Sequence, residues 1–106
     1  MKTVPSRGEV WIVDLGLAQK SRPALIVSTE YGDEDRALIT VVPHTTALRN
    51  SVHEVEVQTS FLARGGAFLV QGLTAIPRAH AVRRLGVLTD MQMAAVEKQM
   101  RLWLGL

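Results

Sequence analysis

The stretch EVWIVDLGLAQKSRPALIVSTEYGDEDRALITVVP, residues 9–43, decides the fold of this chain. It contains runs of β-branched and aliphatic residues, and polar segments with glycine separate these runs. The runs cover Glu9–Leu15, Arg22–Ser28 and Ala37–Pro43, and each has the composition of a β-strand. Because strand and helix patterns do not alternate here, the stretch argues against a parallel α/β sheet and favours antiparallel strands.

The chain continues in short strands beyond this stretch. In His53–Thr59, valine alternates with glutamate and glutamine, which is typical of a half-exposed strand. Gly65 and Gly66 then turn the chain into a strand at Ala67–Gln71, and Leu73–Pro77 follows as another. We therefore expect five or six short strands before the last segment of the chain.

The last segment has the pattern of one amphipathic helix. Thr89 is suited to be the N-cap, and Asp90 follows it in the first turn, where the helix dipole favours a carboxylate. Apolar residues then recur at helical spacing as far as Leu104, and these residues are Met93, Val96, Met100 and Trp103. Glu97 and Arg101 are spaced to pair on the polar side. The sequence thus predicts a mainly-β fold, a small antiparallel barrel with a C-terminal amphipathic helix, in one domain over residues 1–106.

Composition limits the chemistry that the chain can perform. The 106 residues include no cysteine, which excludes disulfide scaffolds, zinc ribbons, iron–sulfur sites and thiol catalysis. No apolar run approaches the roughly 18 residues of a membrane span, and the N-terminal residues lack the core of a signal peptide. The net charge is only +2, but nine of the 12 basic residues are arginine, the residue best suited to binding phosphate. We expect a protein of the reducing cytoplasm that does not bind membranes.

Common catalytic motifs are missing from the sequence. It has no glycine-rich phosphate loop, no GxGxxG and no GxSxG. His44, His53 and His80 are isolated from one another, so neither a metal nor another cofactor is predicted. No spacing brings two acidic side chains together as a hydrolytic pair.

Polar residues at strand ends remain as candidates. Arg22 begins one strand, His44, Thr45 and Thr46 end another, and Gln71 ends a third. Strand ends at one rim of a barrel can bring such groups together, and a guanidinium, a hydroxyl and an amide suit a phosphodiester. The alternative is that each residue is an ordinary solvent-exposed side chain.

Several segments resemble the MazF/PemK-type toxins of bacterial toxin–antitoxin systems. The segments are RGEVWIVDLG, KSRPALIVS, ITVVPHTT, FLVQGLTAIP and RRLGVLT, followed by the final helix. They occur in the order and spacing of that family, and the resemblance extends from Ser6 to Leu104.

This resemblance implies an SH3-like barrel that forms a homodimer and cleaves single-stranded RNA sequence-selectively without a metal. The substrate 2′-OH would attack the phosphorus and leave a 2′,3′-cyclic phosphate and a 5′-OH. Arg22 and Thr45 occupy the positions of the family's catalytic arginine and threonine. By this likeness, Arg22 would balance charge on the phosphorane and assist proton transfer, and Thr45 would bind the phosphate.

A substrate-binding set would surround these two catalytic residues. Its members are His44, Thr46, Gln71, Arg49 and Arg7. His44 is also a candidate general base because imidazole titrates near pH ~6.5, although strict alternation along a strand would point it away from Thr45. Many family members have an arginine two residues after the glutamine, and Leu73 stands at that place here, so base recognition should differ.

The resemblance also implies a protein partner, a cognate antitoxin whose extended segment lies across the RNA groove. Two other functions stay open at this point, since fold alone does not determine function. One is a CcdB-like toxin, which is not an enzyme and binds DNA gyrase with the end of its helix, near Trp103, Gly105 and Leu106. The other is a catalytically inactive barrel that binds RNA without cleaving it.

Overall fold

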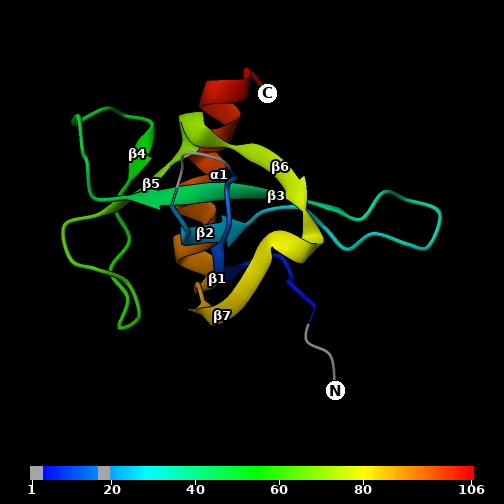
Figure 1. The fold of residues 1–106 in the computed structure, drawn as a ribbon. Coiled ribbons are helices and arrows are strands. Elements are labelled where there is room, and N and C mark those ends of the chain that lie inside the picture. The colour runs from blue at the N-terminus through cyan, green and yellow to red at the C-terminus, as the bar shows by residue number, and fades with distance from the viewer. Residues whose placement is uncertain (1–3, 17–19) are drawn as a thin grey trace.

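The longest strand, β3, organises the sheet in the computed structural model, which describes residues 4–16 and 20–106 (Figure 1). The elements in chain order are β1 (Glu9–Val13), β2 (Arg22–Ile26), β3 (Leu38–Thr45), β4 (Glu54–Val55), β5 (Ala67–Leu69), the 3₁₀ turn η1 (Val70–Gly72), β6 (Thr74–Pro77), the 3₁₀ turn η2 (Arg78–His80), β7 (Ala81–Val87) and α1 (Asp90–Leu104). None of the helices in the described part of the chain is long and apolar enough to cross a membrane.

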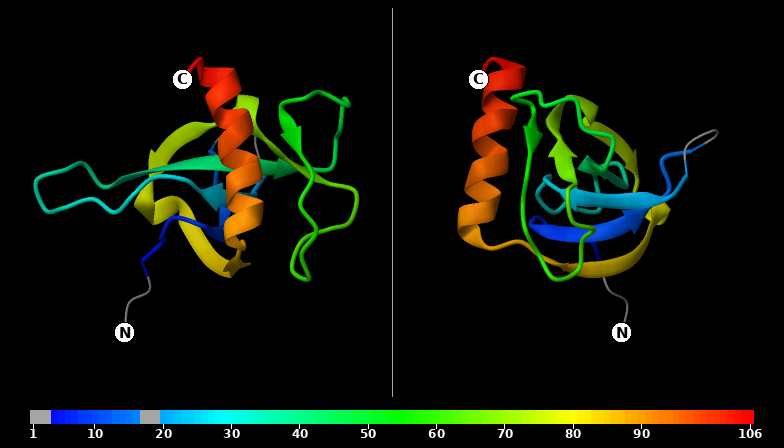
Figure 2. Two further views of the ribbon diagram at one scale, coloured as in Figure 1. Left: turned by 180° about the vertical axis from the view of Figure 1, so that it is seen from behind. Right: turned by 90° about the vertical axis from the view of Figure 1, so that its left-hand side faces the viewer.

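All strand pairs are antiparallel, and the sheet runs in the order β4-β5-β3-β2-β1-β7. One edge of β3 serves two strands, because β6 pairs with its first half and β5 with its last two residues. The sheet curves strongly around its axis (Figure 2), and β4 and β7 stand at its two ends. The mainly-β fold with a terminal helix is therefore confirmed, although the described ladders form an open curved sheet and not a closed ring.

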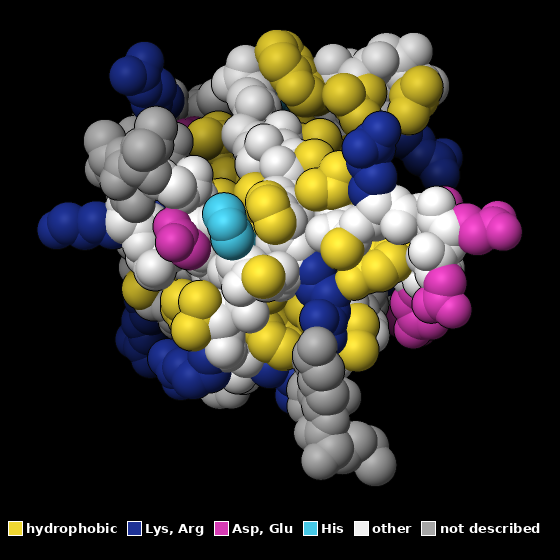
Figure 3. All heavy atoms as spheres, turned by 45° about the vertical axis from the view of Figure 1, so that its right-hand side comes forward, with side chains coloured by type: hydrophobic (Ala, Val, Ile, Leu, Met, Phe, Trp, Pro, Cys, Tyr) yellow, Lys and Arg dark blue, Asp and Glu magenta, His cyan; other side chains and the backbone are white. Residues whose placement is uncertain are grey.

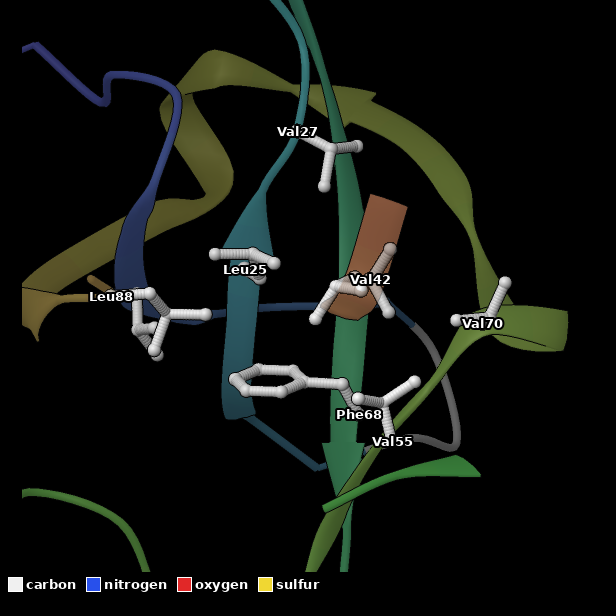
Figure 4. Close-up of a cluster of buried hydrophobic side chains, with 9 residues drawn as sticks. Leu25, Val27, Val42, Val55, Phe68, Val70 and Leu88 are labelled. Carbon is white, nitrogen blue, oxygen red and sulfur yellow. The ribbon is translucent and has the colours of Figure 1, made fainter. Parts of the chain in front are cut away.

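Alternation along the strands divides the core into two clusters. On one face, Leu25 and Val42 pack with Phe68 and with Val96 of α1 (Figure 4). On the other face, Ala24, Ile26 and Val41 pack with further apolar residues, among them Trp11 and Ile76. Because successive residues point to opposite faces, these assignments also fix which face each polar strand-end residue occupies.

Helix α1 begins and ends as its sequence predicts. Thr89 accepts a hydrogen bond from the backbone N–H of Gln92, whose side chain in turn accepts the Thr89 N–H, so the two form a capping box. At the other end Gly105 takes a left-handed conformation (φ 71°), and its N–H donates to the carbonyl of Arg101.

The apolar stripe of α1 is shorter than predicted. Val96 is fully buried, and Met93 and Met100 pack partly buried against the first cluster. Trp103 remains 44% exposed and stacks at a tilt on His53, with 5.1 Å between the ring centroids. Met100 is thus the last residue of α1 that packs on this cluster, and the prediction that Trp103 faces the core was wrong.

The strand predicted at His53–Thr59 is also shorter, since β4 has only two residues. It is an edge strand whose single neighbour, β5, has three residues, so the ladder runs out after Val55. Similarly, β5 ends at Leu69 because η1 tightens the chain before it reaches β6.

Candidate active site

A groove of about 480 Å³ lies where the strand ends of β1, β2 and β3 meet β6 and the two 3₁₀ turns. Its walls include Leu15, Arg22, Pro43, Gly72, Thr74 and His80, and we call it the Arg22 groove. Figure 3 shows the molecule from the β6 side, where Lys and Arg side chains stand among exposed apolar ones. Of the polar residues predicted at strand ends, Arg22 lines this groove and supplies a cation of the kind that binds phosphate.

Arg22 is held in this groove by its place in the sheet. It begins β2 directly opposite Val13 at the end of β1, and Pro23 follows it. Its Nε atom is buried and has no hydrogen-bond partner among the residues that the structure describes. A buried guanidinium nitrogen without a partner costs free energy, and an anion in the groove would satisfy it.

Thr45 lies on the same face of the sheet as Arg22. In the ladder between β2 and β3, Ala24 is opposite Pro43; Arg22 comes two residues before Ala24 and Thr45 two residues after Pro43, so alternation puts both on the face of that pair. The Thr45 hydroxyl oxygen accepts the N–H of Ala47 at 3.0 Å. A hydroxyl that accepts in this way keeps its own proton to donate, so Thr45 is prepared to bind a phosphate oxygen.

His44 lies on the opposite face, and this corrects the prediction that it binds substrate. Its side chain is buried, with 5% of the residue exposed, and its ring meets Phe68 edge-on at 5.1 Å. Gly66 leaves the space for this ring, because a Cβ atom there would lie 2.3 Å from His44 Cε1. Since β3 stays a regular strand through Pro43 to Thr45, alternation turns His44 into the core.

Burial makes His44 a source of pH-dependent stability. Desolvation lowers the pKa of His44 below its ordinary value, so the folded state favours the neutral ring. The unfolded chain takes up this proton near pH ~6.5. The free energy of unfolding should therefore fall as the pH drops below 6.5, by at most about 1.4 kcal/mol per pH unit.

Urea unfolding at several pH values between 8 and 5 measures this dependence. His44→Gln removes the titrating ring and should flatten the slope, whereas His53→Gln should leave it steep. A His44→Gln slope equal to that of the parent protein would show that His44 does not cause the effect.

The exposed members of the predicted binding set lie on loops around this edge of the sheet. Thr46 follows β3 directly, and Gln71 is the middle residue of η1, next to Gly72 in the groove wall. Arg49 lies in the loop before β4, where the Glu54 carboxylate accepts its backbone N–H. The backbone N–H of Ser51 and then that of Arg49 lower the pKa of Glu54, because they stabilise its charged form. The binding role of Thr46, Gln71 and Arg49 stays a prediction.

Arg7 belongs to a different part of the molecule. Its guanidinium donates to the carbonyl of Val27 and to the carboxylate of Glu97, so it ties the sheet to α1. It lines a separate groove together with Glu97 and Met93. The substrate-binding role of Arg7 stays a prediction, whereas Glu97 pairs with Arg7 in place of the predicted pair with Arg101.

Comparison with known proteins identifies the family of this chain. Residues 6–104 match the PemK-like, MazF-like toxins of type II toxin–antitoxin systems. The chain belongs to this family. It is 29% identical over 98 residues to the probable endoribonuclease MazF5 of Mycobacterium tuberculosis, covering 91% of this chain and 89% of the relative.

Solved structures of MazF-type proteins share the fold. The M. tuberculosis toxin MazF-mt6 superposes with a TM-score of 0.79 at 26% identity, over 92% of this chain and 97% of that one. An endoribonuclease from a mycobacterial species, solved in complex with its cognate antitoxin, gives a TM-score of 0.80 at 25% identity, over 96% of each chain. The resemblance drawn from the sequence is confirmed.

This member of the MazF-like family departs from the common pattern at Gln71-Gly72-Leu73, and the structure gives a packing reason. A Cβ atom on Gly72 would lie 2.8 Å from Pro43 Cγ, so glycine lets η1 approach β3 closely. This close approach forms one wall of the Arg22 groove. The loop between β1 and β2 includes residues 17–19, which lie outside the described part of the chain.

His80 is a groove residue that sequence reasoning missed, because it is an isolated histidine. It is the last residue of η2, just before β7. No local pattern marks it, since it has neither a second histidine nor an acid at a regular spacing. Within the described residues, no group of three or more histidine, aspartate or glutamate side chains could hold a metal ion.

Proposed function

We propose that this chain is the toxin of a type II toxin–antitoxin pair and a sequence-selective endoribonuclease that cleaves single-stranded RNA without a metal. The observation that supports it best is the place of Arg22 in its groove, with Thr45 on the same face of the sheet two residues after Pro43 of the groove wall. Membership of the MazF-like family and the endoribonuclease relatives point to the same activity.

The two residues fit the charge changes of this reaction. When the 2′-oxygen attacks phosphorus, negative charge grows on the non-bridging oxygens of the phosphorane. The Arg22 guanidinium offers several N–H donors in one plane, and the Thr45 hydroxyl offers one more. Donors that are already oriented toward the developing charge lower the barrier most, because they need no reorganisation during the reaction.

Partners follow from the same family. We propose that a cognate antitoxin covers the substrate surface and that two copies of the chain form a homodimer, with the whole toxin domain in residues 1–106 acting in the cytoplasm. The end of α1 supports self-association, because its exposed apolar side chains gather at the top of the molecule in Figure 3. These side chains are Leu102, Trp103, Leu104 and Leu106.

RNA cleavage in the presence of EDTA tests the proposal. We expect discrete cuts in a long single-stranded RNA, with 2′,3′-cyclic phosphate and 5′-OH ends. Thr45→Ala should slow cleavage about 10- to 100-fold, which corresponds to the loss of one hydrogen bond to a charged group. Thr29→Ala removes an exposed threonine from the connection between β2 and β3 and serves as the matched control.

Intact RNA after incubation with the folded, antitoxin-free protein would refute the nuclease proposal. Binding of that RNA without cleavage would then indicate an inactive RNA-binding barrel. Inhibition of DNA gyrase by the same sample would indicate the CcdB-like function instead.

A further inference from the structure

We infer that His80 is the general base of the RNA cleavage proposed above, accepting the proton of the attacking 2′-OH on its Nε2 atom. This inference rests on the proposed function, and it assigns the proton-transfer step to a residue outside the pair drawn from the family resemblance. The argument uses the place of His80, the hydrogen bond of its ring and the chemistry of its free nitrogen.

Sheet topology brings His80 to the same groove as Arg22. Val13, the last residue of β1, is opposite Arg22 on one side and opposite Ala81 on the other. Arg22 and Ala81 are therefore separated by two strand spacings, about 10 Å, and His80 directly precedes Ala81. Both long side chains line the Arg22 groove, so a phosphodiester between them can contact each.

The backbone at the end of β1 fixes His80 in this position. The N–H of Asp14 donates to the carbonyl of His80 at 2.9 Å, and His80 Nδ1 lies 3.1 Å from the carbonyl oxygen of Asp14. The two residues thus hold each other through both backbone groups of Asp14. His80 is therefore held once through its backbone and once through its ring, which restricts the ring before substrate binds and suits a residue that must meet a reacting atom.

The same contact selects the tautomer of the ring. A carbonyl oxygen only accepts hydrogen bonds, so Nδ1 must hold the proton that it donates to Asp14. In the neutral ring, the lone pair is then on Nε2. Nε2 is the nitrogen left free to accept a proton, and neutral imidazole has the basicity that acid–base catalysis near neutral pH requires.

The step balances without any further reactant. As the 2′-oxygen forms its bond to phosphorus, its proton moves to His80 Nε2. The P–O5′ bond breaks with its electron pair on the 5′-oxygen, which takes a proton from water. The imidazolium then returns its proton to the hydroxide so formed, and the products are the cyclic phosphate and the 5′-OH.

A conservative pair of variants tests this role. In His80→Asn an amide N–H replaces the Nδ1 donor toward Asp14, and in His80→Gln an amide replaces the outer end of the ring; both lack a base. Each should cleave about 10²-fold or more slowly, yet bind an RNA with a 2′-deoxy nucleotide at the mapped cleavage site as tightly as the parent protein. Added imidazole should restore part of the His80→Asn activity and none of the activity lost in Arg22→Ala. His53→Asn, which lies against Trp103, is the control and should cleave at the parent rate.

A substrate with a sulfur leaving group distinguishes whether His80 acts as a general base or as a general acid. An RNA with a bridging 5′-phosphorothiolate at the cleavage site needs no proton on its leaving atom, so a general base predicts the same loss in His80→Asn with this substrate. A loss that disappears there, unchanged cleavage in both variants, or a loss explained by weaker RNA binding would each overturn the role of His80. If the parent protein itself does not cleave RNA, the proposed function fails first.

Discussion

Arg22→Lys should slow RNA cleavage by about 10²- to 10³-fold, although the charge at the site is kept. Lysine presents a point charge on a flexible stem, whereas the guanidinium presents N–H donors in a fixed plane. Arg22 is partly buried at the start of β2, and its Nε has no partner within the described residues, so this nitrogen is free to bind phosphate. The loss should fall on the rate of the chemical step, because the geometry of the donors matters most when charge develops on the phosphorane.

Single-turnover cleavage with excess protein measures this rate separately from RNA binding. Arg36→Lys is the matched control, since Arg36 is exposed in the connection between β2 and β3, and it should leave the rate unchanged. Retention of the parent rate in Arg22→Lys would show that charge alone suffices. The planar donor set of Arg22 would then have no part in catalysis.

Much of this site could be predicted because strand ends and family motifs are local features of the sequence. Arg22 before proline and Thr45 after Val-Val-Pro-His are visible without any structure. Their mutual placement depends on the register of β2 on β3, in which Ala24 meets Pro43. Register is set by packing on both faces and by the connection between the strands, and no short motif reports it.

His44 and Arg7 show where local reasoning stops. His44 adjoins Thr45 in sequence, but alternation puts the two side chains on opposite faces once the strand runs straight through Pro43. Arg7 adjoins the start of β1, and its partner Glu97 comes from a helix 90 residues later. Neither the continuity of β3 nor the docking of α1 can be read from the residues around these positions.

His80 is a residue whose proposed role no local sequence pattern predicts. An isolated histidine joins the site only through the topology of the sheet. β7, far from β1 and β2 in sequence, pairs with β1 at Val13, and only this pairing brings Ala81 within two strand spacings of the start of β2. The SH3-like resemblance predicts such a meeting in general, but the identity of the residue at the corner belongs to this chain.

Phe68→Ala should lower the free energy of unfolding by about 3–5 kcal/mol, the largest stability loss that we expect from one substitution. Phe68 is fully buried in β5 and is among the largest side chains in the core (Figure 4). Its replacement leaves a cavity between the sheet and α1 that neighbouring side chains, fixed on four strands and a helix, can fill only in part. Because small domains have only about 5–15 kcal/mol in total, much of the variant could be unfolded at growth temperature.

Urea unfolding followed by tryptophan fluorescence measures this loss, and Phe68→Leu, which keeps most of the apolar volume, should lose less.

The same cavity should also affect the active site. In the ladder between β3 and β5, Phe68 is opposite His44, which directly precedes Thr45. The ring of Phe68 therefore packs against the end of β3 on the core face, and Thr45 lies on the other face of the same strand end. Folded Phe68→Ala should therefore cleave RNA more slowly than folded Phe68→Leu, and equal rates per folded molecule would show that the core and the site are independent.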